Sequence, residues 1–233
     1  MKKFVAVLMP LCAIVGVAQA QTFFTPTGSK DNAGETVNAQ AVFTVDAKAG
    51  TVTVNLWNLL TAPQMHSVGQ DLSDIEFTLS GTGFTGAAIS STSPYQDQFI
   101  DVASGGAVTL NSKSNQLGWG LQGSNNSYTL EDLGFAGPHN TLIGGTPGDL
   151  TAYSNANASI AGNGPHQNFI QGRADWVINI SGMNSDTKVT SATFSFGTTL
   201  GDNVKGTTPE PATMGLMLVG VTAVIRRRVK SSK

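Results

Sequence analysis

The stretch VNAQAVFTV, from Val37 to Val45, has an apolar side chain at every second position, and TVTVNLWN, from Thr51 to Asn58, continues the alternation. A period of two residues is that of a β-strand with one buried face. The five residues between the two segments, DAKAG, are of types that form turns. This stretch therefore predicts a β-hairpin.

The same period recurs farther along the chain. Alternating segments predict strands over 74–80, 174–181 and 189–196, and we expect the last two to form a second hairpin around a turn at 182–188. Weaker strand candidates lie at 84–90, 107–110, 118–121 and 127–130. Residues 91–165 otherwise contain many turn-forming residues, so we expect any binding site in these loops.

Composition points to the same fold class. Of 233 residues, 27 are glycine and only 12% are charged, and no helical period longer than one turn occurs between residues 21 and 208. We therefore predict an all-β fold, an antiparallel β-sandwich of jelly-roll-like type. A right-handed parallel β-helix is the alternative, and the lack of a fixed repeat of about 20–50 residues disfavours it.

The first twenty residues have the three parts of a secretory signal peptide. Lys2 and Lys3 form a basic start, residues 4–17 are apolar, and Ala18 and Ala20 occupy the two small-residue positions of a cleavage site. Cleavage by signal peptidase after Ala20 would place the mature protein outside the inner membrane.

Three elements follow one another at the other end of the chain. Pro209, Glu210 and Pro211 precede fourteen uncharged residues, Ala212–Ile225, and then a basic block, Arg226-Arg227-Arg228. Fourteen helical residues rise about 21 Å, whereas a bilayer core is about 30 Å thick. The segment is therefore short for a permanent transmembrane helix. The arginines favour the cytoplasmic side, which leaves the prolines exposed at the outer face.

This order of motif, apolar run and basic cluster resembles the C-terminal sorting signal of PEP-CTERM proteins of Gram-negative bacteria. The resemblance covers only about residues 208–229. It implies recognition of Pro209-Glu210-Pro211 by exosortase, transient anchoring in the inner membrane, removal of the tail and export with exopolysaccharide. A plain C-terminal membrane anchor is the alternative, while a buried core helix is disfavoured by the basic block.

The predicted organisation has five parts. They are a signal peptide at 1–20, a secreted β-domain at 21–205, a linker with the Pro-Glu-Pro motif at 206–211, a hydrophobic sorting helix at 212–225 and a basic cytoplasmic tail at 226–233.

Charge and cysteine content restrict the function of the β-domain. Between residues 21 and 208, six basic residues stand against fourteen acidic ones, a net charge of about −8. An acidic domain repels phosphate backbones, so we do not expect nucleic acid as a partner. The single cysteine, Cys12, lies in the N-terminal apolar run, so no disulfide can form within the mature domain.

No motif for catalysis or metal binding stands out. His66, His139 and His166 are isolated from one another and from cysteine, and no nucleophile elbow or phosphate loop is present. We predict no catalytic residue, metal site or cofactor. The acidic loops leave a structural calcium ion as an alternative.

Two tryptophans are candidate ligand aromatics. Trp57 and Trp119 fall off or between the cleanest alternating segments, and exposed aromatic rings stack on sugars in sandwich-type carbohydrate modules. Packing in the core is the commoner fate of such residues.

Three functions remain. We expect an exported, non-enzymatic protein of the cell surface or extracellular matrix, processed by exosortase and associated with exopolysaccharide or biofilm. The alternative is a carbohydrate-binding module of the β-sandwich type. An extracellular hydrolase ranks last, since it would need catalytic groups that converge in one cleft.

Overall fold

The computed structural model describes residues 18–90, 98–111, 118–135, 137, 140–199 and 201–209. This part of the chain is all-β, as predicted, and its helices are three short 3-10 turns, η1 (Ala62–Gln64), η2 (Val68–Gln70) and η3 (Gly164–His166). None of its helices is long and apolar enough to cross a membrane. The predicted sorting helix lies outside the described residues.

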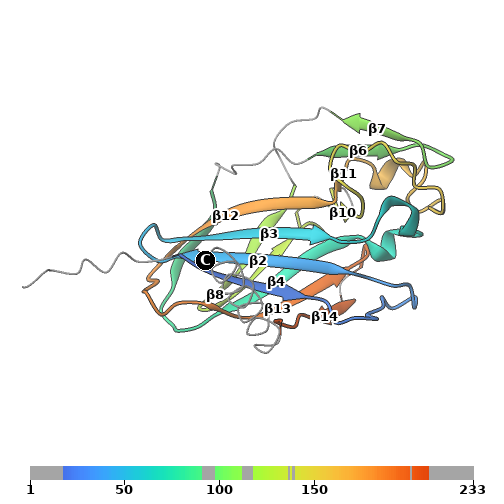
Figure 1. Ribbon diagram of the computed structural model, residues 1–233. Coiled ribbons are helices and arrows are strands. Elements are labelled where there is room, and N and C mark those ends of the chain that lie inside the picture. Colours follow the sequence, from blue (N-terminus) through green and yellow to red (C-terminus); the bar gives the residue numbers. More distant parts are fainter. Residues whose placement is uncertain are drawn as a thin grey trace, which may run out of the picture.

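The strands form two sheets (Figure 1). The five-stranded sheet has the order β1 (Gln19–Phe24), β2 (Ala39–Asp46), β3 (Thr51–Asn58), β12 (Arg173–Ser181) and β5 (Thr85–Ile89). The main path of the nine-stranded sheet is β14 (Asn203–Lys205), β13 (Val189–Phe196), β4 (Leu72–Leu79), β10 (Leu142–Ile143), β11 (Phe169–Gln171), β6 (Phe99–Val102) and β7 (Val108–Asn111). Off this path, β9 (Ser127–Glu131) pairs with β4, and β8 (Gly120–Ser124) pairs with β9.

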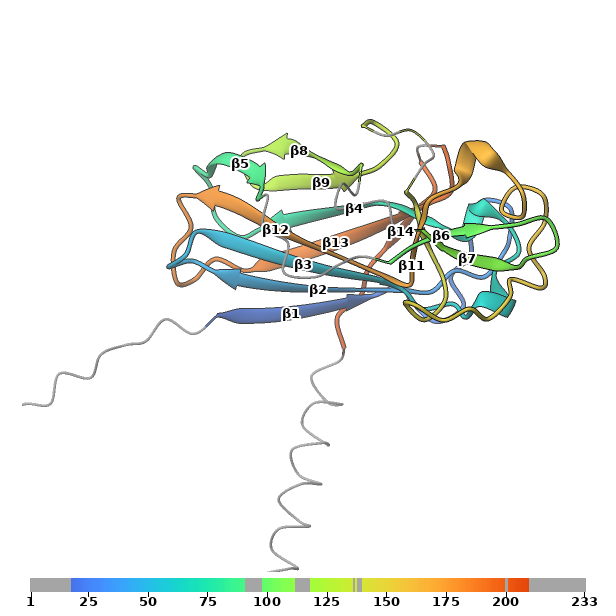
Figure 2. The same cartoon turned by 90° about the horizontal axis from the view of Figure 1, so that it is seen from above.

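Antiparallel pairing predominates, as predicted. Every strand pair in the described residues is antiparallel except β10 with β11. The two sheets pack against each other through one apolar core (Figure 2). Phe43 of β2 and Phe77 of β4 lie in opposite sheets, with ring centroids 5.1 Å apart.

The hairpin predicted from the opening stretch is confirmed. β2 pairs with β3 from Ala39 opposite Asn58 to Asp46 opposite Thr51. Along both strands the predicted apolar positions are buried and the intervening positions are partly exposed. The predicted turn at 46–50 is one residue shorter in the structure, at 47–50, because Asp46 ends β2 and pairs with Thr51.

The predicted second hairpin is wrong. Both strands exist, but β12 pairs with β3 and β5 in one sheet, whereas β13 pairs with β4 and β14 in the other. The turn between them therefore connects the two sheets. Alternation shows that a strand has one buried face, but it does not identify the strand beside it.

The loops at one end of the two packed sheets enclose a second, smaller core. Its members come from the 3-10 turns, from β6, β10 and β11, and from the loop 144–163: Leu60, Ala62, Met65, Ile100, Val102, Ile143, Tyr153, Ile160 and Phe169. Figure 1 shows these loops gathered beyond the ends of β2, β3 and β12. The loop-rich region is thus packed, and this packing positions the pockets described below.

The two ends of the described domain are joined. Phe24 and Thr207 exchange two backbone hydrogen bonds, of 2.9 and 2.8 Å. This bridge connects the outer strand of the five-stranded sheet to the residues just after β14. The strand β1 begins at Gln19, so the predicted cleavage after Ala20 would remove its first two residues and leave Gln21–Phe24 paired with β2.

Candidate functional site

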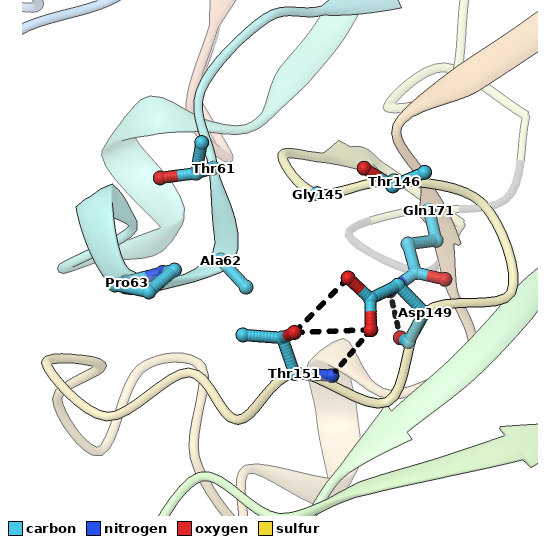
Figure 3. Close-up of a pocket in the computed structure, with 8 residues that line it drawn as sticks. All are labelled: Thr61, Ala62, Pro63, Gly145, Thr146, Asp149, Thr151 and Gln171. Carbon is cyan, nitrogen blue, oxygen red and sulfur yellow. Dashed lines mark hydrogen bonds between the residues drawn. The ribbon is translucent and has the colours of Figure 1, made fainter.

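A pocket of about 230 Å³ opens between η1 and the loop that follows β10 (Figure 3). Thr61, Ala62 and Pro63 form one wall, and the opposite wall comes from the loop and the end of β11. The lining residues on that side are Gly145, Thr146, Asp149, Thr151 and Gln171. We call this the Gln171 pocket.

Gln171 fixes the shape of this pocket. Its side chain is only 1% exposed. The Oε1 atom accepts a hydrogen bond from Gly148 N at 2.8 Å, and Nε2 donates to the carbonyl of Asp149 at 2.8 Å. The Tyr153 hydroxyl donates to the carbonyl of Gly144 at 2.6 Å and secures the start of the same loop. The loop is therefore held before any ligand arrives.

The glycine that follows Gln171 is required by the close approach of two chain segments. Gly172 has a φ of +72°, and a Cβ atom there would collide with the carbonyl oxygen of Gly145. A side chain at this position would be strained and would push the loop away from β11.

Asp149 is the only charged residue in the lining of the Gln171 pocket. Its Oδ1 accepts hydrogen bonds from the Thr151 backbone N–H and hydroxyl, each at 3.0 Å. These bonds fix the carboxylate, which can still accept more, since a carboxylate has about four lone-pair sites. The pocket can thus accept hydrogen bonds from hydroxyl groups. Its described lining residues include no basic side chain that could pair with an anionic ligand.

The wall formed by η1 is also fixed. Gln64 Oε1 accepts hydrogen bonds from the Thr61 backbone N–H at 2.8 Å and from the Thr61 hydroxyl at 2.9 Å. Asn155 Nδ2 donates to the carbonyl of Pro63 at 2.7 Å and ties this turn to the loop beyond. The ring of Pro63 stays exposed.

A second pocket, of about 630 Å³, also includes Pro63 in its lining. We call it the Glu35 pocket. Its lining residues are Gly34, Glu35, Thr36, Leu60, Pro63, Gln64, His66, Gln70 and Asn155. The carboxylate of Glu35 contacts His66 Nδ1 at 2.5 Å and accepts a hydrogen bond from the Ser67 hydroxyl. The imidazole is largely exposed, with 59% of its side-chain surface accessible.

Ser67, which bonds to Glu35, does not form a nucleophilic triad with His66 and Glu35. In such a triad the histidine lies between the serine and the acid, whereas here Glu35 binds both His66 and Ser67. Glu35, and not His66, accepts the serine hydroxyl, so the arrangement orients the imidazole without making it the base for the serine.

The two candidate aromatics lie in different surroundings. Trp119 is 7% exposed, its ring centroid lies 4.8 Å from that of Trp176, and its Nε1 donates to the carbonyl of Asn140 at 2.9 Å. Of the two alternatives, the structure therefore supports core packing for Trp119. Trp57 is partly exposed on the face of β3 opposite the core, with the Arg173 guanidinium 5.0 Å from its ring centroid.

The remaining predicted sites are only partly described. Ala18 and Ala20 are exposed at the start of the described chain, and Pro209 is exposed at its end. Glu210, Pro211 and Arg226–Arg228 lie outside the described residues, as does His139. His166 contacts the carbonyl of Ser159 through Nδ1 at 2.9 Å.

Asp71, Asp74 and Glu76 are close in sequence, but the fold gives their side chains different surroundings. Asp71 is fully buried, and its carboxyl group accepts a hydrogen bond from the Thr141 hydroxyl at 3.0 Å. Burial raises the pKa of Asp71 well above its ordinary value. Burial also raises the pKa of Asp74 to about 6. Glu76 instead points outward and accepts a hydrogen bond from Ser127 at 2.9 Å. Within the described ranges, no three acidic, histidine or cysteine side chains are placed to hold a metal ion.

Sequence reasoning did not identify Asp149, Thr151 or Gln171. The segment GGTPGD at 144–149 indicates a turn, but a turn does not reveal that its carboxylate faces a 3-10 helix some eighty residues earlier. The loop is held beside the η1 segment by a hydrogen bond from Gly145 N to the carbonyl of Leu60, of 2.7 Å, while the parallel pairing of β10 with β11 brings Gln171 to the same loop. Comparison of the chain with protein-family models found no match, and a search among curated proteins found none.

Proposed function

We propose that this chain is an exported, non-enzymatic protein of the cell surface or extracellular matrix, delivered by a C-terminal sorting signal that exosortase recognises and processes. One observation carries the proposal: the order Pro209-Glu210-Pro211, Ala212–Ile225, Arg226–Arg228 in the sequence. A short apolar segment with a basic inner flank suits transient membrane insertion.

The end of the folded domain supports this proposal. The last backbone hydrogen bonds of the described chain join Thr207 to Phe24, and the exposed Thr208 and Pro209 follow at once. A processing enzyme acting at or beyond Pro209 would therefore leave the closing bridge and β14 in place. The tail could be removed without unfolding the protein that it delivers.

For the fold of this domain we propose the β-sandwich class. The facing sheets share one core to which both contribute aromatic residues. The consecutive neighbours β1, β2 and β3 make a simple meander, whereas a jelly roll is built from two Greek keys. The meander is confined to these three strands, because β3 pairs with β12, β12 with β5 and β4 with β13, and our proposal is therefore limited to the sandwich class.

The basic block provides the test of sorting. Arg226, Arg227 and Arg228 are replaced together by glutamate in a Gram-negative host that contains an exosortase. A matched variant replaces the same three residues by lysine. If the positive charge positions the tail, the glutamate variant should accumulate with its tail uncut, while the lysine variant is processed.

The readout is the fraction of protein that retains a C-terminal epitope tag, measured over time by immunoblot. Normal removal of the tag from the glutamate variant would contradict the sorting proposal. So would normal removal from the parent chain in a host strain whose exosortase gene is deleted.

A further inference from the structure

We propose that the Gln171 pocket and the Glu35 pocket together bind a short segment of a neutral polysaccharide. Both pockets include Pro63, the second residue of η1, in their lining. We call the combined surface the Pro63 groove. The inference rests on the proposed function, because export to the cell surface would bring the protein into contact with exopolysaccharide.

The chemistry of the groove suits hydroxyl groups. In the Gln171 pocket, Asp149 accepts hydrogen bonds, and Thr61, Thr146 and Thr151 carry hydroxyls at the rim. In the Glu35 pocket, the Gln64 and Asn155 amides and the His66 imidazole provide donors and acceptors. Sugars have many hydroxyls that both donate and accept, so a mixed polar lining can satisfy them.

The charge of the groove selects a neutral ligand. The lining of the Gln171 pocket contains one carboxylate and no basic side chain. In the Glu35 pocket the only group that can become cationic is His66, and Glu35 already contacts it. The predicted mature domain carries about −8 overall. Uronic-acid and phosphate-bearing polymers would therefore be repelled.

The shape favours a polymer over a single sugar. Typical pockets for drug-sized ligands hold about 300–1,000 Å³, and the Gln171 pocket, at about 230 Å³, is smaller. The Glu35 pocket is larger, at about 630 Å³. A chain of sugars that crosses Pro63 can occupy both, and the exposed proline ring offers an apolar surface for the C–H face of a sugar.

The groove is also organised in advance. Gln171 and Tyr153 hold the loop on one side, and Gln64 and Asn155 hold η1 on the other. A site whose walls are already fixed loses less conformational entropy when a ligand binds. The aromatic pair considered from the sequence is not needed, since neither Trp57 nor Trp119 lines either pocket.

The test uses the full-length chain purified in mild detergent. Its mobility is measured in native gels that contain a neutral glucan, mannan or galactan, with a parallel gel that contains an anionic uronic-acid polymer. Calorimetry then measures affinity for oligosaccharides of one to six units cut from the polymer that retards the protein most. We expect retardation by at least one neutral polymer, none by the anionic one, and affinity that rises with chain length.

Asp149→Ala removes the carboxylate of the Gln171 pocket. Asp186→Ala is the matched control, because Asp186 is exposed in the turn after β12 and lines neither pocket. We expect about tenfold weaker binding for Asp149→Ala, the loss that follows from removing hydrogen bonds to a charged acceptor, and parental binding for Asp186→Ala.

Three results would overturn the inference: no retardation by any neutral polymer, stronger retardation by the anionic polymer, or equal binding by the two variants. None of them bears on tail processing, which is measured in cells. A failed binding test and a failed sorting test are therefore distinguishable.

Discussion

Asp132 is a carboxyl group without a hydrogen-bond partner in the described part of the chain. Its side chain is fully buried, neither oxygen has a partner there, and burial raises its pKa to about 8. A lone charge in such surroundings is costly, so the folded domain keeps this group protonated at neutral pH.

This carboxyl group makes stability depend on pH. Between the ordinary pKa of 3.8 and about 8, the folded state holds a proton that the unfolded state has released. The contribution of Asp132 to the free energy of unfolding is fully present below pH 3.8, the ordinary pKa, and declines as the pH rises toward 8. As the pH rises from 5 to 8, the release of this proton should lower the free energy of unfolding by a few kcal/mol in total, on the order of 1.4 kcal/mol per pH unit.

The variant Asp132→Asn cannot ionise, so its unfolding free energy should vary less with pH than that of the parent chain. Urea unfolding at pH 5, 6, 7 and 8 measures this difference, and Asp186→Asn serves as the exposed control. Parallel pH profiles for Asp132→Asn and the parent would show that Asp132 does not titrate in this range.

Phe77 is the aromatic residue that joins the two sheets. Its ring lies 5.1 Å from Phe43 across the core and 5.7 Å from Tyr128 on the neighbouring strand. Replacement by alanine should lower the free energy of unfolding by about 3–5 kcal/mol, since it leaves a cavity between the sheets. Leu110→Ala, at a position 46% exposed, should lower the free energy of unfolding far less when both variants are unfolded in urea. Equal losses would contradict this account of the core.

At the scale of elements, β14 and the bridge after it close one side of the domain. The strand pairs with β13 through Asn203, Val204 and Lys205, and Gly206 N donates to the carbonyl of Ala192 at 2.8 Å. Thr207 then joins Phe24. These residues cover the edge of β13, which would otherwise present unpaired backbone groups.

Truncation tests this role. A chain that stops after Thr208 should keep the stability of the domain, whereas one that stops after Gly201 should lose on the order of 2–4 kcal/mol, through several backbone hydrogen bonds at about 1 kcal/mol each. Thermal unfolding of the two chains, each lacking residues 1–20, provides the comparison. Equal melting temperatures would show that β14 is dispensable.

The elements that could be predicted are those specified locally. The β2–β3 hairpin follows from alternation and a short turn, and β4, β12 and β13 were located from their own periods. Their partners could not be predicted, since pairing depends on contacts distant in sequence. The strands β10 and β11 have two and three residues, too few to show a period.

The candidate site was the least predictable part. Thr61 and Pro63 belong to η1 and its N-cap. Asp149 lies on the loop after β10, and Gln171 is the last residue of β11. Each has an ordinary sequence context, and only the folding of the loops over a second core brings them together. The proposed sorting motif is the opposite case, since its residues are contiguous in sequence and the proposal needs no structure.

At the scale of the whole molecule, we propose that a sheet-built domain is joined to a removable tail. The domain's two ends meet at one bridge, and its net charge of about −8 opposes binding to anionic polymers. A Pro63 groove selective for neutral glycan would give such a domain a role in an extracellular matrix, the destination that we propose for it.

The most direct test of this account is the intact mass of the protein recovered from the outer surface of a host that contains an exosortase. The account predicts a mass that lacks residues 1–20 and everything after the Pro209-Glu210-Pro211 region, including Arg226–Arg228. A recovered protein whose mass includes the three arginines would contradict the central claim.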